Sequence, residues 1–147
     1  MYPFRCRSPK ENLTIPPVFR KSTMKYRLLI VEDEEYVLEL ISDIFIDAGT
    51  WEILCARDGE EALKIARVYN PDIILLDIQL PKLNGYQVCM SLKTDPTMSH
   101  IKVLMISGMT QNSDREKAQA AGADGYIEKP FFPTVLVDKV EELLRSN

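Results

Sequence analysis

Residues 28–33 read Leu-Leu-Ile-Val-Glu-Asp, four consecutive apolar side chains followed directly by two carboxylates. Similar runs recur further along: residues 73–77 read Ile-Ile-Leu-Leu-Asp, and residues 103–107 read Val-Leu-Met-Ile-Ser. Continuous apolar runs of this length are typical of strands covered on both faces, as in a parallel sheet. Weaker runs at 53–56 and 125–127 predict two further strands.

Segments with helical patterns alternate with the predicted strands. In residues 37–45 apolar side chains recur at the three- and four-residue spacing of a helix that buries one face. Residues 58–61, 84–87 and 113–116 each place a capping residue three positions before Glu or Gln, a pattern typical of helix starts. A last helix is predicted over 133–144, with proline in its first turn. This alternation predicts an α/β fold, a doubly wound three-layer sandwich around an all-parallel five-stranded sheet with right-handed crossovers.

The composition excludes several classes of protein. Hydrophobic residues make up 46% of the 147 residues and charged residues 27%, the balance of a soluble globular protein with a substantial core. The apolar runs are too short to span a bilayer, and the N-terminus lacks the apolar stretch of a signal peptide, so we expect a cytoplasmic protein. Three widely spaced cysteines and a single histidine argue against a disulfide framework and a zinc site. The net charge of −4 argues against direct binding to nucleic acid.

The first 24 residues differ from the rest of the chain in charge. They carry a net charge of +4 and four of the nine prolines, whereas residues 25–147 carry a net charge of −8. Because the stretch shows no apolar periodicity, it cannot bury enough surface to offset its ordering entropy. The sequence therefore predicts a flexible basic arm over 1–24 and one domain over 25–147. Three interpretations of the arm stay open: a tether to an acidic partner, a tail without a role, or a segment preceding a natural start at Met24.

Polar side chains stand at the ends of four of the predicted strands. They are Glu32, Asp33, Asp77, Ser107 and Lys129. The carboxyl ends of parallel strands share one edge of an open sheet, where ligands bind, so we expect these groups to converge there. Any one of them has an ordinary explanation as a helix cap or surface residue, but their coincidence at one edge favours a site. Three carboxylates and one ammonium carry a formal charge of −2, and an oxygen-only donor set favours Mg²⁺.

Four motifs occur in order along the predicted domain. Residues 30–34 read Ile-Val-Glu-Asp-Glu, and residues 76–85 read Leu-Asp-Ile-Gln-Leu-Pro-Lys-Leu-Asn-Gly. Residues 106–108 read Ile-Ser-Gly, and residues 122–131 read Gly-Ala-Asp-Gly-Tyr-Ile-Glu-Lys-Pro-Phe. Together they resemble the receiver domain of two-component and phosphorelay response regulators, over nearly all of residues 25–147. The resemblance implies a flavodoxin-like fold with the sheet order 2-1-3-4-5.

The resemblance also implies a reaction and a set of site residues. Asp77 would accept a phosphoryl group from a phosphohistidine and later lose it by hydrolysis. Mg²⁺ would be held by Asp33, Asp77 and the main-chain carbonyl of Gln79, with Glu32 acting through a water molecule. The cation and Lys129 would neutralise the phosphoryl oxygens.

A conformational switch is implied as well. Ser107 would donate a hydrogen bond to the new phosphoryl group, and Tyr126 would rotate inward into the space that is freed. The surface formed by the fourth helix, the fifth strand and the fifth helix would then be the output. The Lys129-Pro130 bond is expected to be cis. Glu32 replaces the shorter Asp, and Ser107 replaces Thr, both as tolerable variants.

Three functional interpretations follow from the resemblance. The first is a stand-alone signalling switch, not a metabolic enzyme, which catalyses only its own phosphotransfer and dephosphorylation. Its partners would be a sensor histidine kinase or a histidine phosphotransfer protein and a downstream protein target. It would be a monomer or a phosphorylation-dependent dimer, with no contact to membranes. The second is the receiver of a larger, DNA-binding regulator whose output domain is absent from this chain, and the third is an adaptor that is never phosphorylated.

Overall fold

The computed structural model describes residues 26–48, 51–108 and 112–146. Within them, five parallel strands form one sheet in the order β2-β1-β3-β4-β5. The strands are β1 (Tyr26–Val31), β2 (Trp51–Ala56), β3 (Ile73–Asp77), β4 (Lys102–Ser107) and β5 (Gly125–Glu128). The predicted strands, their parallel pairing and the order implied by the resemblance are confirmed.

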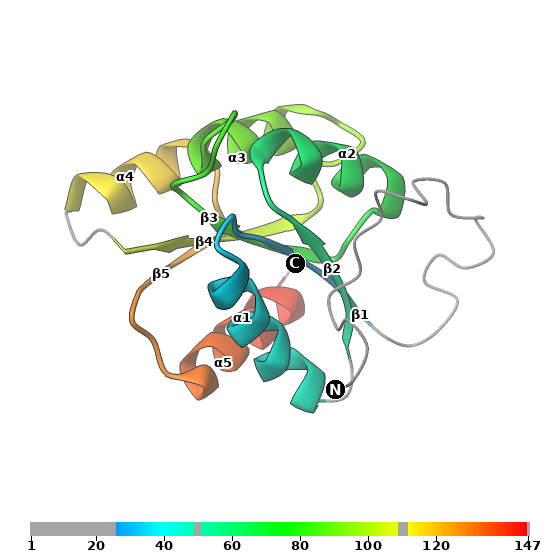
Figure 1. The fold of residues 1–147 in the computed structure, drawn as a ribbon. Coiled ribbons are helices and arrows are strands. Elements are labelled where there is room, and N and C mark those ends of the chain that lie inside the picture. The colour runs from blue at the N-terminus through cyan, green and yellow to red at the C-terminus, as the bar shows by residue number, and fades with distance from the viewer. Residues whose placement is uncertain (1–25, 49–50, 109–111, 147) are drawn as a thin grey trace.

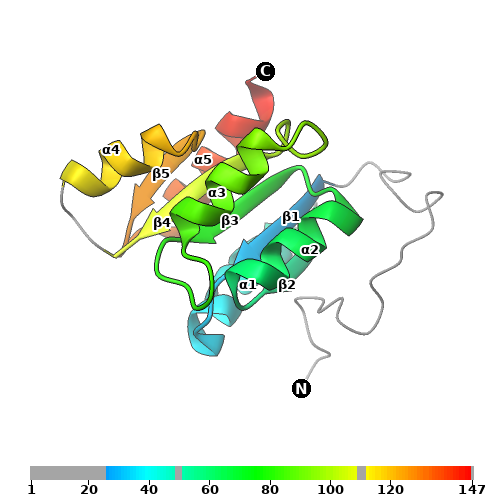
Figure 2. The same cartoon turned by 90° about the horizontal axis from the view of Figure 1, so that it is seen from above.

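Five helices alternate with the strands and cover both faces of the sheet. They are α1 (Glu35–Ala48), α2 (Gly59–Tyr69), α3 (Gly85–Thr94), α4 (Asn112–Ala120) and α5 (Pro133–Arg145). Figure 1 shows α1 and α5 on one face and α2, α3 and α4 on the other, and Figure 2 shows the same layers from above. Within the described residues, none of the helices has the combination of length and hydropathy that spanning a bilayer requires. The fold is the predicted three-layer sandwich.

Successive residues of each central strand enter two different apolar cores. In β1, Leu28 and Ile30 pack toward α1 and α5, whereas Leu29 and Val31 pack toward α2 and α3. Side chains alternate across a strand, so a continuous apolar run fills both layers at once. The periodicity of the sequence thus accounts directly for the layers of the fold.

The helix starts agree in part with the predicted caps. Asn84 and Gln87 form the complete reciprocal box at the start of α3. At α2, Asp58 accepts a hydrogen bond from the Glu61 main-chain N–H at 2.8 Å, but the Glu61 carboxylate accepts from the N–H of Arg57 instead of the cap residue. Helix α4 begins at Asn112, so Ser113 lies inside it and does not precede it. Helix α5 begins after Phe132 without a side-chain cap, as its sequence indicates.

An arginine is buried where β1 begins. Strand β1 starts at Tyr26, two residues before the predicted run, because Arg27 is 1% exposed and paired within the sheet. Its Nε donates to Glu52 Oε1 of β2 at 2.9 Å, and its Nη1 donates to the Tyr69 carbonyl at 2.7 Å. Burial of a guanidinium is tolerated when its charge and donors are matched in this way. The apolar pattern could not indicate this, because Arg27 interrupts it.

Candidate functional site

Four strands deliver polar side chains to one edge of the sheet. Glu32 and Asp33 follow β1 directly, Asp77 ends β3, Ser107 ends β4, and Lys129 follows β5. The main-chain N–H of Glu32 donates to the Ala56 carbonyl at 3.0 Å, which extends the β1–β2 pairing and fixes the position of the acidic pair. Asp77 lies opposite Ile106 in the β3–β4 register, one residue before Ser107. The predicted convergence of these residues is therefore found.

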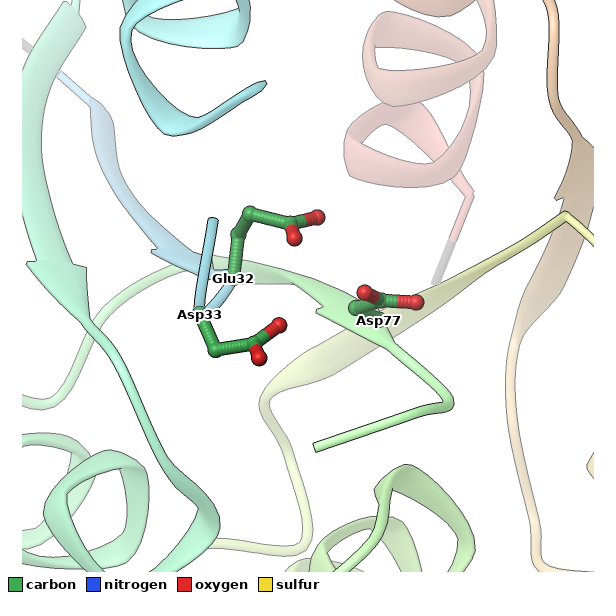
Figure 3. Close-up of side chains that lie close together, drawn as sticks. All are labelled: Glu32, Asp33 and Asp77. Carbon is green, nitrogen blue, oxygen red and sulfur yellow. The ribbon is translucent and has the colours of Figure 1, made fainter. Parts of the chain in front are cut away.

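Three carboxylates form a compact cluster at this edge. Glu32, Asp33 and Asp77 each offer an oxygen, and these atoms all lie within 4.8 Å of one another. Figure 3 shows the side chains of Glu32 and Asp33 extending from the end of β1 toward Asp77. Glu32 is 2% exposed and Asp77 8% exposed, whereas Asp33 faces solvent. The cluster is thus open on one side and buried on the other.

Lys129 places one positive charge against this cluster. Its Nζ lies 3.4 Å from Glu32 Oε1 and 3.7 Å from Asp77 Oδ2. Its main-chain N–H donates to the Ser107 carbonyl at 2.7 Å, so pairing of the chain with the end of β4 holds the lysine backbone in place. The Lys129-Pro130 bond is cis, as expected. One ammonium facing three carboxylates leaves the formal charge of −2.

The two buried carboxyls resist ionisation. Burial and the facing charge of Asp77 raise the pKa of Glu32 to about 7 from its ordinary 4.5, although Lys129 opposes the shift. Burial likewise raises the pKa of Asp77, while Lys129 and a hydrogen bond from the Gln79 N–H act in the opposite direction. Desolvation of a carboxylate and a like charge nearby both disfavour the ionised form.

The donor set fits a hard divalent cation. The three side chains offer carboxylate oxygens, and no histidine or cysteine is among them. Oxygen ligands such as these are the ones that Mg²⁺ prefers. Three carboxylates facing the Lys129 ammonium leave more formal negative charge at the site than this lysine offsets. A divalent cation would relieve this imbalance.

We expect Glu32→Gln to change how the stability of the metal-free protein depends on pH. The folded-state pKa of about 7 exceeds the ordinary 4.5, so the folded protein binds this proton more tightly than the unfolded chain does. The stabilisation is therefore complete below the unfolded pKa and is lost as pH rises through the folded pKa. Between about pH 5 and pH 8, the unfolding free energy of the wild type in EDTA should fall by about 1–2 kcal/mol relative to Glu32→Gln. Urea denaturation measures this difference, and parallel pH profiles of the two proteins would contradict it.

The loop between β3 and α3 is held tightly beneath Asp77. The N–H of Gly85 donates to the Ile78 carbonyl at 2.8 Å, and a Cβ built on Gly85 would lie 2.5 Å from the Asp77 carbonyl oxygen. Only glycine allows this approach of α3 to the end of β3. Gln79 lies on the exposed side of the loop, and its N–H reaches Asp77 Oδ1 at 3.4 Å.

Two further predicted residues lie on the neighbouring strands β4 and β5. Ser107 is buried at the end of β4, and Tyr126 is half-buried on β5. The guanidinium of Arg115, on α4, lies over the Tyr126 ring at 4.6 Å from its centroid. The sequence gives no signal for Arg115, because its contact joins a helix to a strand and follows no local spacing.

The two described cysteines and the histidine lie outside this cluster. Cys55 and Cys89 are buried and form no disulfide among the described residues, and burial raises the pKa of Cys89 to about 11, which disfavours a reactive thiolate. His100 is exposed in the turn before β4. Cys6 and the whole predicted arm fall outside the described residues.

The family model of the response regulator receiver domain matches residues 28–141. The polar-differentiation response regulator DivK of Brucella ovis is 36% identical over 121 residues, which cover 82% of this chain and 98% of DivK.

Solved structures of receiver domains and chemotaxis response regulators have the same fold as this chain. The receiver domain of a signal transduction histidine kinase from Syntrophus aciditrophicus superposes with a TM-score of 0.76 at 30% identity, covering 83% of this chain and 95% of that one. The chemotaxis protein CheY4 of Vibrio cholerae does so with a TM-score of 0.76 at 27% identity, covering 81% and 98%.

Proposed function

Because the chain belongs to the receiver domain family of response regulators, we propose that it is a phosphorylatable signalling switch. The phosphoryl group would come from a histidine kinase or a histidine phosphotransfer protein and would be accepted by Asp77. The observation that carries this proposal is the convergence of Asp77 with Glu32, Asp33 and Lys129 at one sheet edge. A lone aspartate at a strand end would not support it.

The chemistry requires positioning and charge neutralisation more than proton transfer. A carboxylate oxygen of Asp77 attacks phosphorus while the phosphorus–nitrogen bond of phosphohistidine breaks, and its electron pair stays on the imidazole nitrogen. Lys129, 3.7 Å from Asp77 Oδ2, would contact a transferred phosphoryl oxygen. Attack of water on phosphorus later restores the carboxylate and releases inorganic phosphate.

Four residues would hold the cation. Asp33, Asp77 and the main-chain carbonyl of Gln79 would bind Mg²⁺ directly, and Glu32 would act through a water molecule. When bound, Mg²⁺ supplies positive charge to the phosphoryl oxygens. The buried position of Glu32 suits an indirect role, because its carboxyl already accepts a hydrogen bond from the Glu34 N–H at 3.2 Å.

The switch would begin at Ser107. Its hydroxyl would donate a hydrogen bond to the phosphoryl group, and Tyr126 would turn inward from its half-buried position. The output surface would be formed by α4, β5 and α5. Phosphorylation then acts by stabilising one of two arrangements through contacts made only in that state.

The chain as a whole would consist of two parts. Residues 25–147 would form the receiver domain and residues 1–24 a flexible basic arm. The protein would work in the cytoplasm as a monomer or a phosphorylation-dependent dimer and would act on a downstream protein. It would catalyse only its own phosphotransfer and dephosphorylation.

Intact-mass spectrometry after incubation with acetyl phosphate tests the proposal. With Mg²⁺ we expect the protein to gain the mass of one phosphoryl group, and with EDTA we expect no gain. Acetyl phosphate is small, so the result does not depend on knowing the natural donor. Absence of any gain, both with this donor and with a noncognate kinase, would instead support an adaptor that works without phosphorylation.

A further inference from the structure

Helix α4 is held to the domain by very little apolar surface. Among its described side chains, residues 114–120, the only buried apolar one is Ala118. By contrast, α5 buries Leu136, Val140 and Leu143. Burial of apolar area is the main source of stability for a docked helix, so the position of α4 depends more than usual on polar contacts.

The contact of α4 with α3 is weak and incomplete. The hydroxyl of Tyr86 donates to the Asp114 carbonyl oxygen at 3.4 Å and to Asp114 Oδ1 at 3.5 Å, both long for hydrogen bonds of a hydroxyl. Asp114 Oδ2 is buried without a partner among the described residues. A buried acceptor without a donor costs free energy, so this side of α4 does not by itself secure the helix.

Arg115 connects α4 with β5 through two contacts. Arg115 places its guanidinium over the Tyr126 ring, and its Nη2 lies 3.8 Å from Glu128 Oε2. Tyr126 and Glu128 are alternate residues of β5 and so share one face of the strand. Arg115 therefore contacts both Tyr126, which the proposed function assigns to the switch, and Glu128, the next residue on the same face of β5.

We propose that Arg115 is a positioning residue that holds Tyr126 in its present half-buried position and so opposes the switch. The proposal rests on the proposed function, because it concerns the residue expected to move. A ring that turns inward leaves the guanidinium, so the cation–π contact stabilises only the resting arrangement. A contact made only in the resting state lowers the affinity for a phosphoryl group by the same factor by which it favours that state.

Binding of beryllofluoride, an unreactive mimic of a phosphoryl group, tests this inference. Isothermal titration in Mg²⁺ would compare the wild type with Arg115→Gln and with Lys117→Gln. Lys117 is an exposed cation two residues further along α4, so both variants remove one positive charge from the same helix. We expect Arg115→Gln to bind beryllofluoride about two- to fivefold more tightly than Lys117→Gln, the factor that an exposed cation–π contact provides.

The sign of the effect separates this role from a general effect of charge. Loss of a cation alone would weaken binding of an anion in both variants, whereas loss of the contact with Tyr126 strengthens it in Arg115→Gln only. In a Tyr126→Leu background, the two α4 variants should bind equally.

Two other outcomes have distinct meanings. Equal affinities of Arg115→Gln and Lys117→Gln in the presence of Tyr126 would overturn the inference and leave the proposed function standing. No binding of beryllofluoride by the wild type would overturn the proposed function, and the inference with it.

Discussion

Asp77→Asn is expected to lower the rate of phosphorylation by acetyl phosphate by at least about a thousandfold, to the level seen in EDTA. The amide of asparagine keeps the size and shape of the side chain but is a far weaker nucleophile than a carboxylate. Lys129 would remain beside Glu32 at 3.4 Å, so the rest of the charge cluster stays in place. Intact-mass spectrometry over a time course measures the rate.

A matched control substitution tests whether the loss of phosphorylation is specific to position 77. Asp138→Asn makes the same chemical change at an exposed position of α5 and should phosphorylate at the wild-type rate. Asp77→Asn removes a charge that faces the buried Glu32, so its metal-free form should be at least as stable as the wild type at neutral pH. Phosphorylation of Asp77→Asn at the wild-type rate would show that another residue is the acceptor.

Gly85→Ala should destabilise the domain by about 3 kcal/mol. The new Cβ would lie 2.5 Å from the Asp77 carbonyl oxygen and 2.8 Å from Ile78 Cα, and both are main-chain atoms that cannot rotate away. Either the start of α3 must move, which strains its hydrogen bond to the Ile78 carbonyl, or the end of β3 must move. Urea denaturation measures the loss of stability, and slower phosphorylation would report a displaced Asp77.

Gly108→Ala is the control for this substitution. A Cβ at Gly108 meets no atom within 4 Å, so the change should alter the unfolding free energy by less than about 0.5 kcal/mol. Similar losses in both variants would show that the close approach at Gly85 is not the cause.

Much of the site follows from the sequence, because topology requires it. Once residues 28–31 and 73–76 are recognised as buried parallel strands, the residues after them must lie at one edge of the sheet. This places Glu32, Asp33 and Asp77 together without any knowledge of distances. Lys129 is added by the same rule, and the structure confirms its approach to both Glu32 and Asp77.

Element boundaries and local contacts were less predictable. Strand β1 begins at Tyr26 because Arg27 finds a carboxylate on β2 and a carbonyl at the end of α2. Glu61 accepts from Arg57 and so leaves the predicted capping box half formed. In each case a polar group selects its partner from neighbours that a pattern of apolar residues does not specify.

The alternation of elements, the parallel sheet and the edge at which the carboxylates meet all follow from the sequence, because they depend on periodicity and strand direction alone. Three further features follow only from the packing in three dimensions: the raised pKa of Glu32, the approach of Gly85 to Asp77 and the contact of Arg115 with Tyr126. Each of these depends on a separation of a few ångströms between segments distant in the chain. Such separations are set by how whole layers pack, and no local pattern of residues encodes them.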